Sequence, residues 1–226
     1  MRKPSFRLIR CGIAAAALVT LAACGPTQFE AKTDIPQPLI EKIPVVVGVH
    51  LPLEFTDKVY EEKRPNGGGT YSIGLGKAQS AGFMRVLNAM FERVVPVASP
   101  QAAAATDAAI RGVLEPVLED FAFVTPVDSG TKMYAASLRY TIRLYSPQGE
   151  LADSWTFTGY GTQPADTFPG RGDEALAAAT RNAMRDAGAK LAAEFREQAI
   201  VRGLLPSAQP AAPREVELPL PPAKNP

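Results

Sequence analysis

Cysteine and histidine are scarce in this sequence. Its 226 residues include two cysteines, Cys11 and Cys24, and a single histidine, His50. Zinc sites in proteins need three or four ligands drawn mainly from histidine, cysteine and carboxylate side chains, and the acidic residues here occur as scattered pairs rather than as a cluster. The sequence therefore predicts no metal site and no cofactor.

Motifs for phosphate binding and for serine hydrolysis are also missing. A P-loop ending at Gly76 would need a glycine in place of Tyr71 and a serine or threonine in place of Ala78. No G-x-S-x-G elbow occurs. We therefore predict that the protein is not an enzyme. A periplasmic hydrolase that uses His50 as a general base remains the weakest alternative, because no motif accompanies that histidine.

The sequence does contain an export signal at its start. An apolar stretch over residues 11–23 ends in small residues, and four basic side chains precede it: Arg2, Lys3, Arg7 and Arg10. This is the layout of a signal peptide. The stretch is shorter than the roughly 20 apolar residues that a transmembrane helix requires, so we predict that residues 1–23 are removed after export.

The signal ends in Leu21-Ala22-Ala23-Cys24, which resembles the lipobox of bacterial lipoprotein precursors. The resemblance implies alkylation of the Cys24 thiol with diacylglycerol, cleavage after Ala23 and acylation of the new amine. Several acyl chains, at about 0.8 kcal/mol per buried methylene, would anchor the protein permanently in a membrane. In Gram-negative lipoproteins an aspartate after the cysteine favours the inner membrane. Gly25 stands there instead, which by resemblance favours the outer membrane, facing the periplasm.

Cleavage would change the charge of the chain. The precursor has 24 Lys+Arg and 23 Asp+Glu, and the signal removes four basic residues, which leaves 20 against 23 and a formal net charge of −3. Nucleic-acid binding needs basic side chains that neutralise phosphates, so we predict no nucleic-acid partner. With Cys11 removed and Cys24 acylated, no disulfide can form even in an oxidising compartment. The core alone must then stabilise the fold.

Proline marks both ends of the predicted mature chain. Residues 24–42 contain prolines and few large apolar side chains, which predicts an extended tether that reaches several nanometres at most. Residues 202–226 contain seven prolines and are predicted to be a disordered tail, more plausibly a spacer than a recognition segment. One globular domain, residues 43–201, lies between them and is large enough to bury a core.

Hydrophobic periodicity predicts the elements of this domain. Alternating apolar residues indicate strands over residues 45–53, 133–145 and 151–157, and weaker candidates over 56–64 and 107–123. Pro116 should bulge the last of these strands or confine it to an edge. Apolar residues spaced as one face of a helix occupy residues 75–93 and 176–199, and a short strand over 94–97 is a further candidate.

The predicted order is β-β-α-β-β-β-α, an α+β two-layer sandwich in which two helices pack on one face of an antiparallel sheet. Cys24, the strand opening at residues 107–112, the strand at 140–145 and its turn at Gly149 together resemble small α/β outer-membrane lipoproteins of envelope assembly. Those include the lipopolysaccharide-assembly, penicillin-binding-protein activator and curli-secretion lipoproteins. The resemblance implies a non-enzymatic accessory role with a protein partner in the periplasm.

Two surfaces are candidates for binding. The segment from Tyr160 to Gly172 is predicted to be a long loop, in which Tyr160, Phe168 and Arg171 form a candidate partner-binding site. The alternative function is a lipid or small-ligand carrier, with a groove between helices and sheet lined by Phe83, Met90, Phe91 and Met184. Co-purifying lipid would distinguish the carrier from the partner-binding protein.

Overall fold

A computed structural model of the chain describes residues 26–32, 35–65 and 69–201. The predicted signal peptide, Cys24 and the proline-rich tail over residues 202–226 lie outside the described residues. No helix within the described part of the chain is both long and apolar enough to cross a membrane.

The larger of two sheets has five strands in the order β5-β2-β6-β7-β8. Strands β6, β7 and β8 form an antiparallel meander, whereas β2 runs parallel to both β5 and β6. The predicted α+β class is confirmed, but the sheet is mixed rather than wholly antiparallel. The strands are β2 (Ile43–Val49), β5 (Phe91–Pro96), β6 (Ile110–Val124), β7 (Met133–Tyr145) and β8 (Leu151–Pro164).

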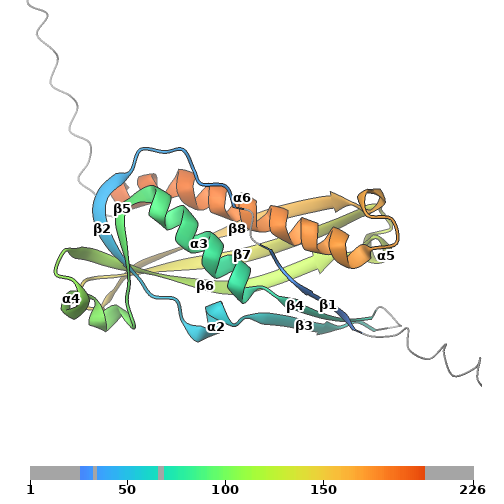
Figure 1. The fold of residues 1–226 in the computed structure, drawn as a ribbon, viewed down its shortest axis with the longest axis horizontal. Coiled ribbons are helices and arrows are strands. Elements are labelled where there is room, and N and C mark those ends of the chain that lie inside the picture. Colours follow the sequence, from blue (N-terminus) through green and yellow to red (C-terminus); the bar gives the residue numbers. More distant parts are fainter. Residues whose placement is uncertain (1–25, 33–34, 66–68, 202–226) are drawn as a thin grey trace, which may run out of the picture.

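Two long helices, α3 (Gly76–Met90) and α6 (Gly172–Val201), cover one face of this sheet (Figure 1). A smaller three-stranded sheet, in the order β1-β4-β3, packs near one end of the molecule. Its strands are β1 (Thr27–Glu30), β3 (Val59–Lys63) and β4 (Thr70–Gly74). Short helices occupy the connections: α2 (Leu53–Thr56), η1 (Pro100–Ala102), α4 (Ala103–Thr106), α5 (Pro126–Ser129) and η2 (Ala165–Thr167).

The main core lies between the helices and the sheet, as the periodicity predicts. Every second residue of β7 is buried, and the same face of β8 buries Trp155 and Phe157. The helices contribute Leu87 and Met90 from α3 and Leu176 from α6, each at most 1% exposed. Burying one such side chain stabilises the fold by about 1.5–3 kcal/mol relative to exposing it, so β7, β8, α3 and α6 together hold the two layers against each other.

The tether predicted over residues 24–42 is wrong for much of its described part, from Thr27 onward. Strand β1 pairs in parallel with β4, and the backbone N–H of Ala31 donates a hydrogen bond to the carbonyl of Gly74. Ile35 is buried in the main core, and its carbonyl accepts a hydrogen bond from Arg85 at 3.0 Å. The domain therefore begins at Thr27 rather than at Ile43. Prolines and charged residues between these few buried positions hide them from a periodicity search.

Pro116 lies inside β6, opposite Ile142 of β7. Strand β2 last pairs with β6 at Leu114, so the missing N–H of the proline faces the side of β6 that β2 no longer covers. The predicted edge position is confirmed locally, while the bulge falls further along, between Leu118 and Asp120.

Helix α6 approaches β8 very closely at two glycines. A Cβ atom added at Gly161 would lie 2.2 Å from the carbonyl oxygen of Ala179 and 2.2 Å from the backbone nitrogen of Ala183. A Cβ atom at Gly159 would meet Ala183 and Ala187 of the same helix. Small residues on both elements thus let the helix axis sit directly against the strand, which fixes the position of α6 on the sheet.

Candidate functional site

The face of the β6–β7–β8 meander opposite α3 and α6 carries polar side chains. On β7 and β8 they alternate with the core residues and are exposed or half-exposed. Thr141 and Thr156 face each other across the two strands, with their hydroxyl oxygens 2.8 Å apart. We call this surface the exposed sheet face and define it by eight residues: Ser137, Arg139, Thr141, Arg143, Ser154, Thr156, Thr158 and Tyr160.

Tyr160, a predicted binding residue, lies on this face within β8 and not in a loop. Its side chain is 63% exposed, and the ammonium group of Lys190 lies 5.0 Å from its ring centroid. A cation over the ring face is attracted by the aromatic quadrupole. The structure thus holds an exposed aromatic ring in a defined position on an otherwise hydroxyl-rich surface.

Polar side chains of α6 bind the outer backbone edge of β8 beside Tyr160. Asp186 accepts a hydrogen bond from the Tyr160 N–H at 2.9 Å, and Lys190 donates to the Thr158 carbonyl at 2.6 Å. Burial raises the pKa of Asp186, but the bonds from Lys190 and Tyr160 outweigh it and hold that pKa below its ordinary value. This part of the edge is therefore closed to an added strand, which favours the face over the edge as a binding surface.

Phe168 and Arg171 follow η2, in a connection that is much shorter than the predicted loop over 160–172. The Arg171 guanidinium lies 5.6 Å from the Phe168 ring centroid and forms an ion pair with Glu174 at 2.9 Å. Phe168 is half-buried and Arg171 is exposed. The three predicted residues therefore do not form one loop, because Tyr160 belongs to the strand and the other two lie at its far end.

A buried carboxylate lies at the opposite end of the exposed sheet face. Glu115 of β6 is 7% exposed; its Oε2 lies 2.7 Å from Nδ1 of His50, and its Oε1 accepts hydrogen bonds from Arg143 and Tyr145 at 3.2 and 3.1 Å. Burial and the Glu115 carboxylate raise the pKa of Tyr145. Glu115 was not among the residues predicted from the sequence, although a single acidic residue among apolar ones in a predicted strand indicates a buried carboxylate with polar partners.

Glu115 orients His50 and Arg143. Among the described residues, side-chain hydrogen bonds join Glu115 to His50, Arg143 and Tyr145. Within residues 26–32, 35–65 and 69–201, no three His, Cys, Asp or Glu side chains are grouped so that they could hold a metal ion. Glu115, His50 and Tyr145 thus form a polar cluster that holds Arg143 in place on the exposed sheet face.

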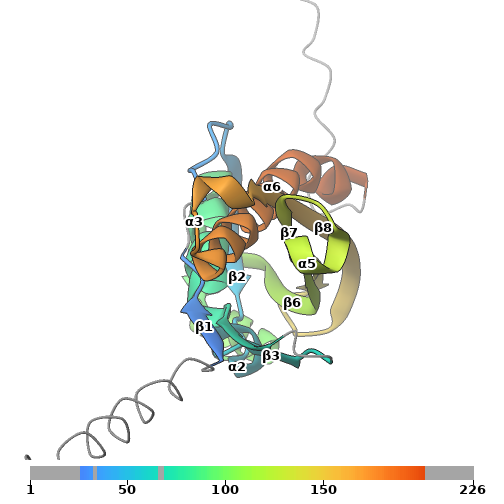
Figure 2. The ribbon, with the colours of Figure 1, turned by 90° about the vertical axis from the view of Figure 1, so that its right-hand side faces the viewer.

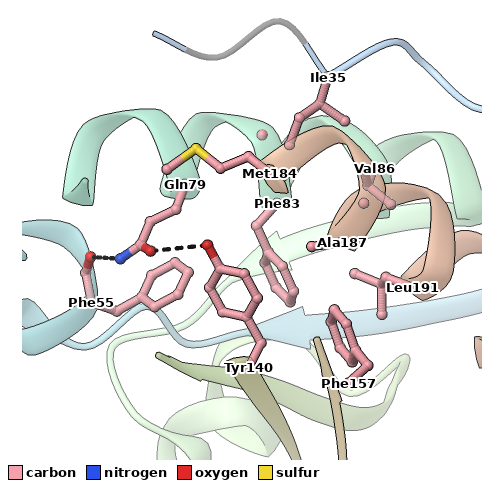
Figure 3. A pocket seen from close by; sticks show the side chains of 12 residues that line it. Ile35, Phe55, Gln79, Phe83, Val86, Tyr140, Phe157, Met184, Ala187 and Leu191 are labelled. Carbon is pink, nitrogen blue, oxygen red and sulfur yellow. Dashed lines mark hydrogen bonds between the residues drawn. The ribbon is translucent and has the colours of Figure 1, made fainter. Parts of the chain in front are cut away.

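An apolar pocket lies between α3, α6 and the sheet (Figure 3). Its internal space is about 30 Å³, room for about one water molecule. Gln79, 3% exposed, donates from Nε2 to the Phe55 carbonyl at 2.6 Å and accepts from the Tyr140 hydroxyl at 3.3 Å. Burial strongly raises the pKa of Tyr140, so this phenol stays protonated.

The predicted carrier groove matches this pocket in part. Phe83 and Met184 line it, together with Ile35, which closes it from the N-terminal segment. Met90 and Phe91 do not line it and are packed in the main core instead. Pockets that bind drug-sized ligands usually measure about 300–1,000 Å³, so the described pocket is too small for an acyl chain.

Comparison with known proteins found no matching family model and no match among curated proteins. Solved structures do resemble the fold. A DUF330-family protein from Xanthomonas campestris is 14% identical over 78% of this chain and 96% of its own, with a TM-score of 0.47. A minor lipoprotein from Acinetobacter baumannii is 12% identical over 75% of this chain and 100% of its own, with a TM-score of 0.43.

A third solved structure is a homologue of the neuraminyllactose-binding hemagglutinin from Helicobacter pylori. It is 11% identical over 76% of this chain and 97% of its own chain, with a TM-score of 0.46. At these low identities and with TM-scores below 0.5, these similarities do not indicate a function for this chain.

Proposed function

We propose that this chain is an outer-membrane lipoprotein of the bacterial envelope, anchored by lipid on Cys24, and that it acts in the periplasm as a non-enzymatic accessory or assembly component. The Leu21-Ala22-Ala23-Cys24 sequence supports the anchor, and Gly25 supports the outer membrane. The protein partner binds the exposed sheet face. The single observation that carries this part is the exposed, ordered array of Tyr, Arg and Thr side chains on β7 and β8.

The residues of this surface suit protein recognition. Tyrosine and arginine are enriched in protein interfaces because they combine apolar area with hydrogen-bonding groups. Tyr160 is positioned by Lys190, and Arg143 is positioned by Glu115. Side chains that are already ordered lose less conformational entropy on binding. The residues that define the face cover positions 137–143 of β7 and 154–160 of β8, seven on each strand, so at about 3.4 Å per residue the face is roughly 24 Å long.

The carrier alternative has less support. The pocket of about 30 Å³ is closed by the buried side chain of Ile35, so binding a lipid would require displacing a core residue. Purified protein that carries no lipid by mass spectrometry agrees with the proposed function, whereas stoichiometric lipid beyond the acyl groups on Cys24 favours the carrier.

Photo-crosslinking in intact cells tests the proposed surface. A photoreactive phenylalanine analogue replaces Thr156 at the centre of the exposed sheet face, and in a matched control it replaces Ala81, which is exposed on α3. We expect a discrete adduct with a second protein from position 156 and none from position 81. If position 156 gives only uncrosslinked monomer, or if both positions give the same adducts, the assigned surface is wrong.

A second pair of variants connects this surface with function. Arg139→Glu reverses a charge on the exposed sheet face. Arg85→Glu reverses one on α3, where the native side chain donates a hydrogen bond to the backbone carbonyl of Ile35. With similar protein levels, we expect the first variant to lose complementation of a deletion strain more severely than the second. Equal complementation by both variants would count against the exposed sheet face.

A further inference from the structure

The first strand begins very close to the predicted lipidation site. Strand β1 starts at Thr27, three residues after Cys24. Three residues span at most about 11 Å when fully extended. If Cys24 carries lipid, as the proposed function holds, the start of β1 therefore lies within about 11 Å of the membrane interface. The long tether predicted from the prolines is replaced by a very short one.

The start of β1 also defines one end of an elongated domain. Figures 1 and 2 show the beginning of β1, the α5 hairpin and the beginning of α6 at the same end of the molecule. Helix α6 has 30 residues and is therefore about 45 Å long. Its C-terminal end at Val201 lies at the opposite end of the molecule (Figure 1). A tether of about 11 Å is short compared with this length.

Side-chain contacts tie α5 to the strand that follows the anchor. Thr27 of β1 is paired with Tyr71 of β4. The Arg64 guanidinium lies 5.3 Å from the Tyr71 ring centroid and forms an ion pair with Asp128 of α5. Three contacts thus link α5 to the first residue of β1: Asp128 to Arg64, Arg64 to Tyr71, and Tyr71 to Thr27. The two elements form one rigid end surface.

The first turn of α6 belongs to the same end. Pro26, Thr27, Tyr134 and Gly172 line one recess. Phe29 of β1 and Phe168 after η2 line a second recess nearby. The start of β1, the start of α6 and the connection that follows η2 are therefore neighbours in space.

This end exposes apolar groups next to basic ones. Val127 of α5 is 90% exposed, no residue of α5 is buried, and Lys132 is exposed beside it. The acidic Asp128 is ion-paired with Arg64, but Asp166 and Asp173 are exposed at the same end. Because basic and acidic side chains are mixed at this end, attraction to anionic lipids would not hold it against the membrane. The short connection between Cys24 and β1 would.

We infer that the end formed by α5, η2 and the first turn of α6 rests on the headgroups of the membrane that holds Cys24, with Val127 at the contact. This inference depends on the lipid anchor in the proposed function. Burying one valine stabilises a membrane contact by only about 1.5 kcal/mol or slightly more. The short tether therefore keeps this end near the membrane, and the contact at Val127 fixes the orientation of the domain. The proline-rich segment after Val201 then starts at the end remote from the membrane.

Depth-dependent quenching of a fluorescent label tests this orientation. The full lipidated protein is purified from membranes as Val127→Cys or as the control Gln148→Cys, which lies in the exposed β7–β8 turn at the far end. Cys11 is absent from the processed chain and Cys24 is acylated, so the new thiol takes the label. The proteins are placed in phosphatidylethanolamine and phosphatidylglycerol vesicles that contain headgroup-spin-labelled lipid.

We expect quenching at position 127 to exceed that at position 148 by about twofold or more, because the two ends are separated by roughly the 45 Å length of α6. Equal quenching, or stronger quenching at position 148, would overturn the inference. A flexible insertion of about 20 Gly and Ser residues after Gly25, with an r.m.s. length of about 25 Å, should lower quenching at position 127. Unchanged quenching would show that the tether does not hold this end in place.

Vesicle flotation separates a failure of the inference from a failure of the proposed function. Protein that floats with the vesicles but shows no contrast between positions 127 and 148 contradicts the orientation alone. Protein that does not float contradicts the lipid anchor itself.

Discussion

Replacing Gly161 with alanine should push α6 away from the sheet. The new Cβ would lie 2.2 Å from two backbone atoms of α6, whereas ordinary contact begins at 3.4 Å, so a separation of about 1.2 Å must be opened. Backbone atoms of a packed helix cannot rotate out of the way as a side chain can. Overpacking a core costs about 1–3 kcal/mol and sometimes more, and the retreat would also lengthen the bonds from Asp186 and Lys190 to β8. We expect a loss near the upper end, about 3 kcal/mol.

Urea denaturation followed by circular dichroism measures this loss, and thermal unfolding should show a fall of about 6–12 °C for a domain of this size. The matched control is Gly130→Ala, where nothing lies within 4 Å of the added Cβ but φ is +67°. The control should cost about 1–2 kcal/mol through backbone strain alone. If Gly161→Ala is no more destabilising than Gly130→Ala, the backbone of α6 does not lie as close to β8 as the structure places it.

Three further predictions test other parts of the structure. Ile35→Ala should lower the free energy of unfolding, measured by urea denaturation, by about 2–5 kcal/mol. The control Leu39→Ala changes a fully exposed side chain in the same segment and should change this free energy little. Equal effects of the two variants would show that the segment is not packed on the domain. Glu115→Ala leaves the partners of a buried carboxylate unpaired and should cost about 1–3 kcal/mol, against almost nothing for the exposed Glu119→Ala; similar midpoints for the two variants would refute the cluster. Burial and the hydrogen bond to Glu62 raise the pKa of Tyr60 to about 12; the protonated phenol is thus favoured in the folded state, and its contribution, complete below pH 10, should decline as the pH rises from 10 to 12. Tyr60→Phe should lack this part of the decline in urea denaturation across that range, and an identical pH profile for both proteins would contradict it.

Long periodic elements were predictable from the sequence because burial repeats along them. Strand β7 occupies residues 133–145 as predicted, and α6 contains the predicted helical face over 176–199. The helix predicted over 75–93 is correct only as far as Met90, because residues 91–93 belong to strand β5. Each element presents many residues to one core, so single exceptions do not hide the pattern. Leu151 is such an exception: it begins the apolar alternation that predicts the strand over 151–157 but is 59% exposed, because a register shift separates it from the rest of the strand.

Short elements were not predictable. Strands β1 and β4 have four and five residues, and β4 ends at Gly74 inside a glycine-rich segment that looked like a flexible loop. Strand β1 is held by its pairing with β4, which lies far along the sequence, and β4 pairs with β3 on its other side. The parallel pairing of β2 with β5 and β6 has the same origin, since periodicity identifies a strand but not its neighbour.

The candidate site was predictable in kind rather than in detail. The alternation of β7 and β8 already indicates a polar face opposite the core, and that face is present. The grouping of Tyr160 with Phe168 and Arg171 was wrong, because β8 continues to Pro164. The role of Glu115 depends on His50, which is 65 positions away, and no local pattern brings such residues together.

Mass spectrometry of the N-terminal peptide from the membrane fraction tests whether Cys24 carries lipid. We expect a chain that begins at Cys24 and carries a diacylglyceryl group on its thiol and an acyl group on its amine, with no such species in Cys24→Ser. A mature chain that begins at another residue, or one with a free Cys24 thiol, would contradict the lipid anchor.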